Sequence, residues 1–508
     1  MFMKINIFSS SCNLFKKNKL EIFIFLSTFF FVIFLRFWNL EKWWLIDGNE
    51  LDMITYLKKS LISIVETKAN PTSTFFPTLL IAKIFFFINS FPEYRYITAF
   101  LCILSTLFIY FAARTFLVNN KKYLAFIPTF LIAINSLILF ATRRFTVDGV
   151  DVLFIGLILY LTFKWRMVKK NIYIYLIFVF SALGINNHGT MLYFTFPLFL
   201  WFGYLLIKNK IKLKTIFFSS ILFLIILLPY INGLRITNYN VYLLEKYYGA
   251  ETATTVLINL FYFNNFVENL YQVIIPSNLW GIISSPYIPD IMILPFLRLS
   301  FLFIILTLPL LVYFYCKFSD SDLKFLILYS YGVIILIFFS PILSTIGHFI
   351  PFFIVFSFLL TKELSLKQKS TKLILIPLIL IIYFNFLLSI QILTKNSYKE
   401  LEQIWPENVK TITIEFIPLR MLNLTYPSIL DDIKKINIFE CRSDGIYVYN
   451  DSHTIYDPDF LKRKNFIQSD MVLLQTVSAC KFYNIFSIDN LPLKYIGRVD
   501  EIAFYNKI

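Results

Sequence analysis

Long apolar runs separated by short polar linkers make up most of the first 393 residues. A helix needs about 20 apolar residues to cross about 30 Å of hydrocarbon. The runs near this length predict about eleven transmembrane helices. They lie near residues 22–37, 95–117, 124–141, 149–165, 172–187, 191–207, 216–232, 291–315, 323–340, 349–361 and 372–393. The pattern therefore predicts an all-α polytopic membrane bundle.

The pattern changes after residue 393. Alternating apolar segments, typical of half-buried strands, occur at 411–416, 445–449 and 471–474, and a helical pattern lies at 427–436. We expect a transmembrane domain over residues 1–393 and a small α/β domain over residues 394–508.

Composition supports the membrane assignment, because 58% of residues are hydrophobic and only 15% are charged. Soluble domains carry about 25% charged residues, so this composition excludes a soluble globular protein. The formal net charge of +16 is carried largely by loops, where lysine and arginine orient membrane spans. No nucleic-acid partner follows from it.

Basic residues gather in alternate loops of the predicted bundle. These loops lie at 119–122, 164–170, 208–214, 317–324 and 362–372. Cytoplasmic loops are enriched in Lys and Arg, so we expect an inner-membrane protein with a cytoplasmic N-terminus. The first run then acts as an uncleaved signal anchor, and the C-terminal domain lies outside the cytoplasm.

The apolar segment 75–90 is an exception. If it spanned the membrane, every later basic loop would move to the outside. With Lys83 near its middle, it is better interpreted as a helix at the outer interface.

Two acidic clusters lie at the predicted outer face, where polar groups at span ends are informative. The first contains Asp47, Glu50 and Asp52. Asp47 and Glu50 share a face if the helix has begun, and a carboxylate in the first turn also suits the helix dipole. The alternative is a capping box without a chemical role.

The second cluster is the segment 143–151, in which Arg143 and Arg144 precede Asp148 and Asp151. Interfacial anchoring is one explanation for the arginines. The other explanation is phosphate recognition by paired hydrogen bonds. It suits the arginines better, because arginines are less common on the outer side of a membrane.

Over residues 20–210, the signal anchor, acidic loop, interfacial helix and Thr142-Arg143-Arg144 with Asp148 resemble the GT-C superfamily of polyprenyl-phosphate-dependent glycosyltransferases. Bacterial relatives of the protein O-mannosyltransferases and of the lipid A aminoarabinose transferases are the most similar. The resemblance implies catalytic carboxylates at Asp47 or Glu50 and at Asp148. The family's adjacent Asp-Glu pair is replaced here by Asp47-Gly-Asn-Glu50, which leaves the identity of the base open.

Further residues are implied by the same resemblance. Arg143, Arg144, His188, Arg298 and His348 would bind the lipid phosphate. Polar-turn and snorkelling roles are the alternatives for His188 and Arg298. A divalent cation between Asp47 and Asp148 is left open, and no other cofactor is expected. In an oxidising compartment Cys441 and Cys480 are candidates for a disulfide.

The implied function is transfer, with inversion, of a sugar from a polyprenyl-phosphate donor to an envelope acceptor that is a glycan, lipid or protein. A carboxylate acts as the base, and membrane lipid surrounds the enzyme. Two rival functions stay open: a transporter or flippase of lipid-linked sugars, and a non-catalytic membrane assembly protein. Confident spans almost free of central charges count against coupled transport.

Overall fold

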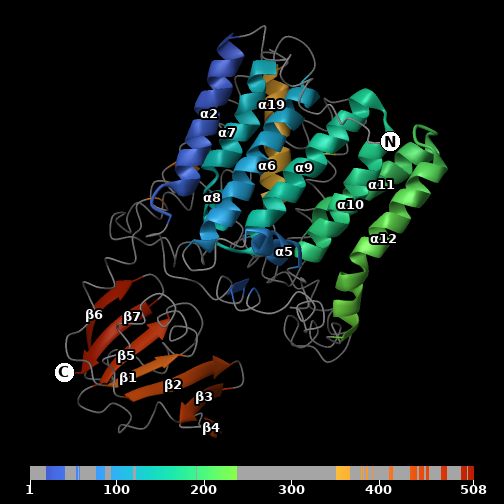
Figure 1. Cartoon of the computed structure of the whole chain (residues 1–508). Helices are drawn as coiled ribbons and strands as arrows, with labels where there is room; N and C mark the ends of the chain where they lie inside the picture. The colour runs from blue at the N-terminus through green and yellow to red at the C-terminus, as the bar shows by residue number, and fades with distance from the viewer. Residues whose placement is uncertain are drawn as a thin grey trace, which may run out of the picture.

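The computed structural model describes residues 19–40, 76–85, 93–117, 122–189, 191–236 and 350–365, seven strands between 411 and 507, and a few isolated positions. The helices within these ranges are α2 (Lys19–Phe37), α5 (Phe76–Ile84), α6 (Tyr94–Phe116), α7 (Phe126–Ile134), α8 (Ser136–Thr142), α9 (Val147–Val168), α10 (Asn171–Asn187), α11 (Met191–Ile207), α12 (Leu213–Ile236) and α19 (Ile350–Ser365). A 3-10 helix, η1 (Lys122–Ala125), precedes α7. Figure 1 shows the longer helices packed side by side as a bundle.

Helix α9 packs against α6 on one side and α10 on another, and α10 packs in turn against α12. The close approach of α6 and α9 depends on a glycine. A Cβ atom at Gly156 would lie 2.9 Å from Ser105 Oγ, and that hydroxyl donates to the Val152 carbonyl at 2.6 Å. Small residues and interhelical hydrogen bonds of this kind join helices that cannot rely on the hydrophobic effect.

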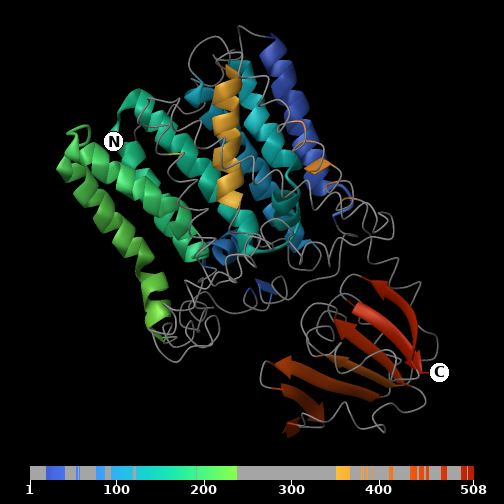
Figure 2. The ribbon, with the colours of Figure 1, turned by 180° about the vertical axis from the view of Figure 1, so that it is seen from behind.

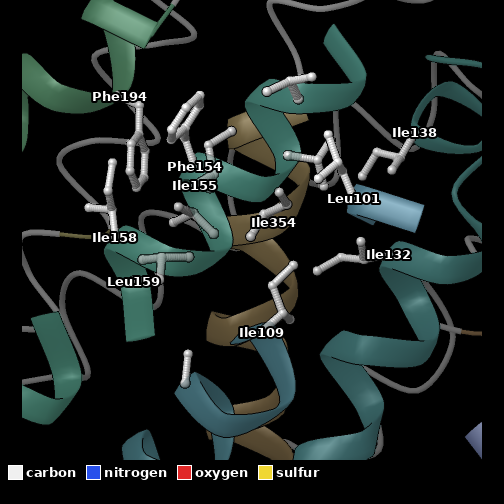
Figure 3. Packing of buried hydrophobic residues seen from close by; sticks show 14 of the residues in the cluster. Leu101, Ile109, Ile132, Ile138, Phe154, Ile155, Ile158, Leu159, Phe194 and Ile354 are labelled. Atoms are coloured by element: carbon white, nitrogen blue, oxygen red, sulfur yellow. The ribbon is translucent and has the colours of Figure 1, made fainter. Parts of the chain in front are cut away.

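Helix α19 is distant in sequence yet packs against α7 and α9. It lies behind α6 and α9 in Figure 1 and in front of them in Figure 2, which shows the molecule from behind. In Figure 3, Leu101, Ile132, Ile138, Ile155 and Ile354 point toward one another from α6, α7, α8, α9 and α19. All five are buried, so this apolar cluster holds α19 to the N-terminal helices.

Among the described helices, Tyr94–Phe116 and Leu213–Asn232 have both the length and the hydropathy of a membrane span. The second is mostly exposed, and its exposed side chains include Phe217, Leu224 and Leu228. Large apolar side chains exposed along one helix suit hydrocarbon rather than water.

The predicted runs that fall on described residues are confirmed as helices, with one correction. The run 124–141 is divided into α7 and α8 by Asn135, whose backbone is extended at φ −61° and ψ 118°. Its side chain accepts a hydrogen bond from the Ile138 amide at 3.0 Å and caps α8. Asparagine favours such caps, and this local bond overrides the apolar pattern. The predicted spans 291–315, 323–340 and 372–393 lie outside the described residues apart from isolated positions.

Helix α5 is the part of segment 75–90 that the structure describes as a helix. Its 9 residues rise about 14 Å, which is less than half of the hydrocarbon thickness. The described helix alone is therefore too short to span, and whether segment 75–90 spans stays a prediction. Its location at the outer interface stays a prediction.

The described strands of the tail form one mixed sheet in the order β4-β3-β2-β1-β5-β7-β6. These strands are β1 (Thr411–Glu415), β2 (Lys435–Arg442), β3 (Gly445–Asn450), β4 (His453–Tyr456), β5 (Met471–Thr476), β6 (Leu493–Val499) and β7 (Ile502–Lys507). In the centre, β1 is parallel to both β2 and β5, and the remaining pairs are antiparallel.

The expected strands at 411–416, 445–449 and 471–474 correspond to β1, β3 and β5. The expected helix 427–436 is wrong at its end, because residues 435 and 436 belong to β2. There Ile436 and Ile438 pair with Ile412 and Ile414 of β1. This sheet pairing overrides the local helical pattern. The rest of that segment lies outside the described residues, and the boundary at 394 stays a prediction.

Candidate functional site

The turn between α8 and α9 carries the Arg143–Asp151 cluster. Helix α8 ends at Thr142, whose Oγ1 donates to the Ile138 carbonyl at 2.6 Å. Helix α9 opens at Val147, so Asp148 lies in its first turn and Asp151 about one turn later. At this spacing the two carboxylates share a helix face.

Asp151 is 4% exposed and contacts two residues at the end of α10. Asn187 Nδ2 donates to Asp151 Oδ1 at 2.8 Å, and His188 Nδ1 lies 3.1 Å from Oδ2. A carboxylate accepts hydrogen bonds, so we assign a proton of His188 to Nδ1. The same nitrogen lies 3.6 Å from Asp148 Oδ1. One imidazole therefore faces both carboxylates.

Asn187 also joins helix α5 to Asp151 through hydrogen bonds. Its Oδ1 accepts from the Thr78 amide at 3.2 Å and from the Thr78 hydroxyl. The first amides of a helix have no partner within it. Thr78 is the third residue of α5, so the Asn187 side chain satisfies one of these amides from another helix. Asn187 Nδ2 also donates to the Val147 carbonyl at 3.1 Å.

His188 follows the last residue of α10, and its surroundings favour the protonated ring. Burial lowers the pKa of His188. The hydrogen bond from its ring to Asp151 and the negative charges of Asp151 and Asp148 raise the pKa, and together they outweigh the effect of burial. The net result is a His188 pKa above the ordinary value of 6.5. A protonated imidazole is a suitable donor to an anionic oxygen.

Asp148, Asp151 and His188 can each offer one ligand atom, and these atoms lie within 4.8 Å of one another. However, both Asp151 oxygens and His188 Nδ1 already take part in the hydrogen bonds described above. A cation bound through His188 Nδ1 would have to replace the hydrogen bond from that nitrogen to Asp151 Oδ2. Asp47, which the sequence leaves open as a ligand of a cation together with Asp148, lies outside the described residues.

Arg143 is fully buried and joins the turn to the end of α2. Its Nη1 donates to the Leu35 carbonyl at 2.8 Å, and its Nη2 donates to the Trp38 carbonyl at 2.7 Å. The last carbonyls of a helix have no partner within it. Arg143 therefore closes α2 at the end where Asp148 and His188 lie.

Two further arginines, Arg36 and Arg95, are fully buried and act electrostatically on Arg143. Arg36 donates from Nε to Cys102 Sγ and from Nη1 to the Ala133 carbonyl, both at 3.1 Å. Arg144 is 8% exposed, with its guanidinium 4.6 Å from the centre of the Phe140 ring. Arg143 and Arg144 thus lie in the turn before the helix that carries both carboxylates, and Arg36 and Arg95 are close enough to act on Arg143.

Comparison with known proteins gives a match to one family model over part of the chain and a fold over nearly all of it. Residues 71–232 match the model of the family described as dolichyl-phosphate-mannose-protein mannosyltransferase. The chain is similar in structure to ArnT from Cupriavidus metallidurans bound to undecaprenyl phosphate, with 10% identity, a TM-score of 0.51, and coverage of 95% of this chain and 97% of that one. The apo state of the same protein gives 11% identity, a TM-score of 0.50, and coverage of 96% and 97%.

The chain has the fold of the GT-C superfamily of membrane glycosyltransferases. The resemblance expected from the sequence is confirmed at this level. No curated protein sequence matches the chain. The matched region of the GT-C bundle begins before α5 and contains Asp148, Asp151 and His188.

Within the GT-C bundle, the structure brings together three of the predicted site residues. Asp148 and His188 lie side by side, and Arg143 lies in the turn that precedes Asp148. Their chemical roles stay predictions, as does phosphate binding by Arg144. The other predicted residues lie outside the described part of the chain: Asp47, Glu50, Arg298, His348 and Cys480.

Sequence reasoning missed the contributions of Thr78, Asn187 and Arg36. Asn187 had a signal, because Asn186-Asn187-His188 is a polar run at the end of an apolar helix. Arg36 had a weaker one, as a single cation closing an apolar run. Thr78 had none, since threonine is common in membrane helices and its partner is 109 residues away.

Proposed function

We propose that this protein is an inverting glycosyltransferase that moves a sugar from a polyprenyl phosphate to an envelope acceptor at the outer face of the inner membrane. The observation that carries the proposal is the pairing of Asp148 with His188 at the end of a GT-C bundle. Arg144 lies three residues before the start of the helix that carries Asp148. Carboxylates beside phosphate-binding cations are the groups that such a transfer needs.

The reaction needs a base and a stabilised leaving group. A carboxylate of the segment 47–50 would take the proton of the acceptor hydroxyl. The hydroxyl oxygen then forms a bond to the anomeric carbon, while the bond from that carbon to the phosphate oxygen breaks. The electron pair leaves with the phosphate, which departs as polyprenyl phosphate. Asp148 would orient the reacting sugar, and the site needs no nucleotide.

His188 and Arg144 would meet the negative charge that develops on the leaving phosphate. A protonated His188, favoured by Asp151 and Asp148, donates a charge-assisted hydrogen bond, which is about twice as strong as a neutral one. Arg143 would contribute by its charge, because its two Nη atoms donate to carbonyls of α2. Fixed donors of this kind often supply much of an enzyme's rate enhancement.

Two comparisons support a lipid-linked donor. The ArnT structure that this chain resembles holds undecaprenyl phosphate, and the matched family is described by a dolichyl-phosphate sugar donor. We extend the chemistry of these donors, a sugar on a polyprenyl monophosphate, to this chain. The acceptor class stays broad: a glycan, a lipid or a protein of the envelope.

The experiment offers two donors to the purified full-length protein in lipid nanodiscs. One donor is a sugar linked to undecaprenyl phosphate, and the other is the same sugar linked to a nucleotide, each with an envelope extract as acceptor. We expect transfer from the lipid-linked donor alone. Transfer from the nucleotide sugar without a lipid carrier would refute the proposal. Movement of the lipid-linked sugar across the bilayer without transfer would favour a flippase instead.

A further inference from the structure

Two consecutive buried asparagines end helix α10, and they bind different parts of the molecule. Asn186 Nδ2 donates to the Ala182 carbonyl at 3.0 Å and to the Ile226 carbonyl of α12 at 2.6 Å. Asn187 instead joins Thr78 of α5 to Asp151 of α9. Both side chains are at most 1% exposed. They therefore form a matched pair, one directed to the bundle and the other to the site.

From Asn187 the hydrogen bonds continue outward toward the site. Asp151 accepts a hydrogen bond from Asn187 on Oδ1 and one from His188 on Oδ2. The side chain of Asp151 is 6% exposed. The side chains of His188 and Asp148 are 13% and 21% exposed. Asp151 is thus less exposed than His188 and Asp148, and it contacts His188 directly, so we infer that it acts on a bound ligand through His188.

The hydrogen bond from Nδ1 to Asp151 fixes how the His188 ring is presented to a ligand. A carboxylate that accepts the Nδ1 proton fixes both the tautomer and the orientation of the ring. The nitrogen that a substrate phosphate would meet is then Nε2. A ring held in advance loses less entropy on binding than one that has to be ordered by the ligand.

We propose that Asp151 and Asn187 are positioning residues: they hold His188 beside Asp148 and lock helix α5 to this pair. The identity of the ligand, a polyprenyl monophosphate, rests on the proposed function. These contacts form one network that orients the His188 imidazole for phosphate binding before the ligand arrives. Its members are Thr78, Asn187, Asp151, His188 and Asp148. Helix α5 depends on the same unit, because Asn187 satisfies the Thr78 amide.

The test measures binding of undecaprenyl phosphate to the full-length protein in nanodiscs. The variants are Asp151→Asn, Asn187→Ala and His188→Ala, together with both double variants that contain His188→Ala. Asn186→Ala is the matched control, because it removes an equally buried amide of the same helix that donates to the Ala182 and Ile226 carbonyls. Thermal unfolding of every variant reports the purely structural cost.

We expect Asp151→Asn and Asn187→Ala each to weaken binding about tenfold, the loss typical of one charge-assisted hydrogen bond. Neither should weaken binding further in the His188→Ala background, since residues that act as a unit are not additive. Asn186→Ala should lower the unfolding temperature and leave binding within about twofold. Equal losses in the wild-type and His188→Ala backgrounds would overturn the inference. If Asp151→Asn does not assemble, Asn187→Ala carries the same test.

Hydrogen–deuterium exchange separates this inference from the proposed function, because it needs no ligand. Asn187→Ala should speed exchange of peptides covering Thr78, and Asn186→Ala should not. If the wild-type protein binds no undecaprenyl phosphate, the proposed donor is wrong, and exchange alone decides the inference. Unchanged exchange in α5 of Asn187→Ala would overturn it.

Discussion

Asp151 and His188 are 37 positions apart in the sequence, yet Asp151 Oδ2 and His188 Nδ1 lie 3.1 Å apart. The contact joins the first half of α9 to the residue that follows α10. It brings a histidine from a turn beside Asp148. The proposed chemistry depends on this convergence, and the predictions below test the arrangement and its orientation in the membrane.

The orientation of the bundle can be tested with reporter fusions. Reporters active in the cytoplasm should work at positions 120, 168, 211 and 366, and reporters active outside should work at 60, 260 and 450. The reason is that five basic loops all fall on one side of the predicted membrane. A cytoplasmic signal from a fusion at 450 would show that the number of spans is even. The predicted placement of both acidic clusters at the outer face would then be wrong.

Arg143 should contribute mainly to stability. Arg143→Lys keeps the charge but cannot reach the Leu35 and Trp38 carbonyls with the same fork geometry. We expect a loss of about 1–3 kcal/mol, the cost of leaving buried groups without hydrogen bonds. Thermal unfolding in nanodiscs measures it. The control is Arg166→Lys. Arg166 lies in the last turn of α9 and is less buried than Arg143. Equal stability of the two variants would contradict this role.

The raised pKa of His188 predicts a pH-dependent contribution to stability. Because the pKa of His188 is higher in the folded protein than the ordinary 6.5, protonated His188 stabilises the fold fully below about pH 6.5. This stabilisation is lost as the pH rises through the folded-state pKa. The unfolding temperature of wild type minus that of His188→Gln should therefore fall as the pH increases. A difference independent of pH would refute the prediction.

The sequence predicted most described helices because membrane spans are long and uniformly apolar, so their pattern survives tertiary context. It failed at Asn135, where one side chain bonds the Ile138 amide and divides a continuous apolar run. It failed also at residues 435 and 436, where pairing with β1 decides the structure. In both places a specific hydrogen-bond partner outweighs average hydrophobicity.

The site was predictable only where residues cluster in sequence. Asp148 and the arginines stand together before one helix, so the pattern singles them out. The contact of Asp151 with Asn187 joins two helices, and nothing in either segment encodes the partner. Pairing across helices depends on the rotation and depth of each helix, which packing such as that of Gly156 against Ser105 determines.

The base is expected to be Asp47, because it stands first where the chain leaves the membrane, with Gly48 leaving room for the substrate. Asp47→Asn preserves a good helix cap but removes the base, so it should fold normally. Loss of a general base costs about 10²–10⁴-fold in rate, and Glu50→Gln should lose less. Normal turnover by Asp47→Asn with loss in Glu50→Gln would transfer the assignment to Glu50.

The most direct test of the account is the initial rate of sugar transfer from undecaprenyl phosphate to an envelope acceptor, measured for wild type and Asp47→Asn in matched nanodiscs. The account predicts turnover by the wild-type protein and a fall of about 10²–10⁴-fold in the variant, with an unchanged unfolding temperature. No turnover by wild type with any lipid-linked sugar, or equal turnover by wild type, Asp47→Asn and Glu50→Gln, would contradict it.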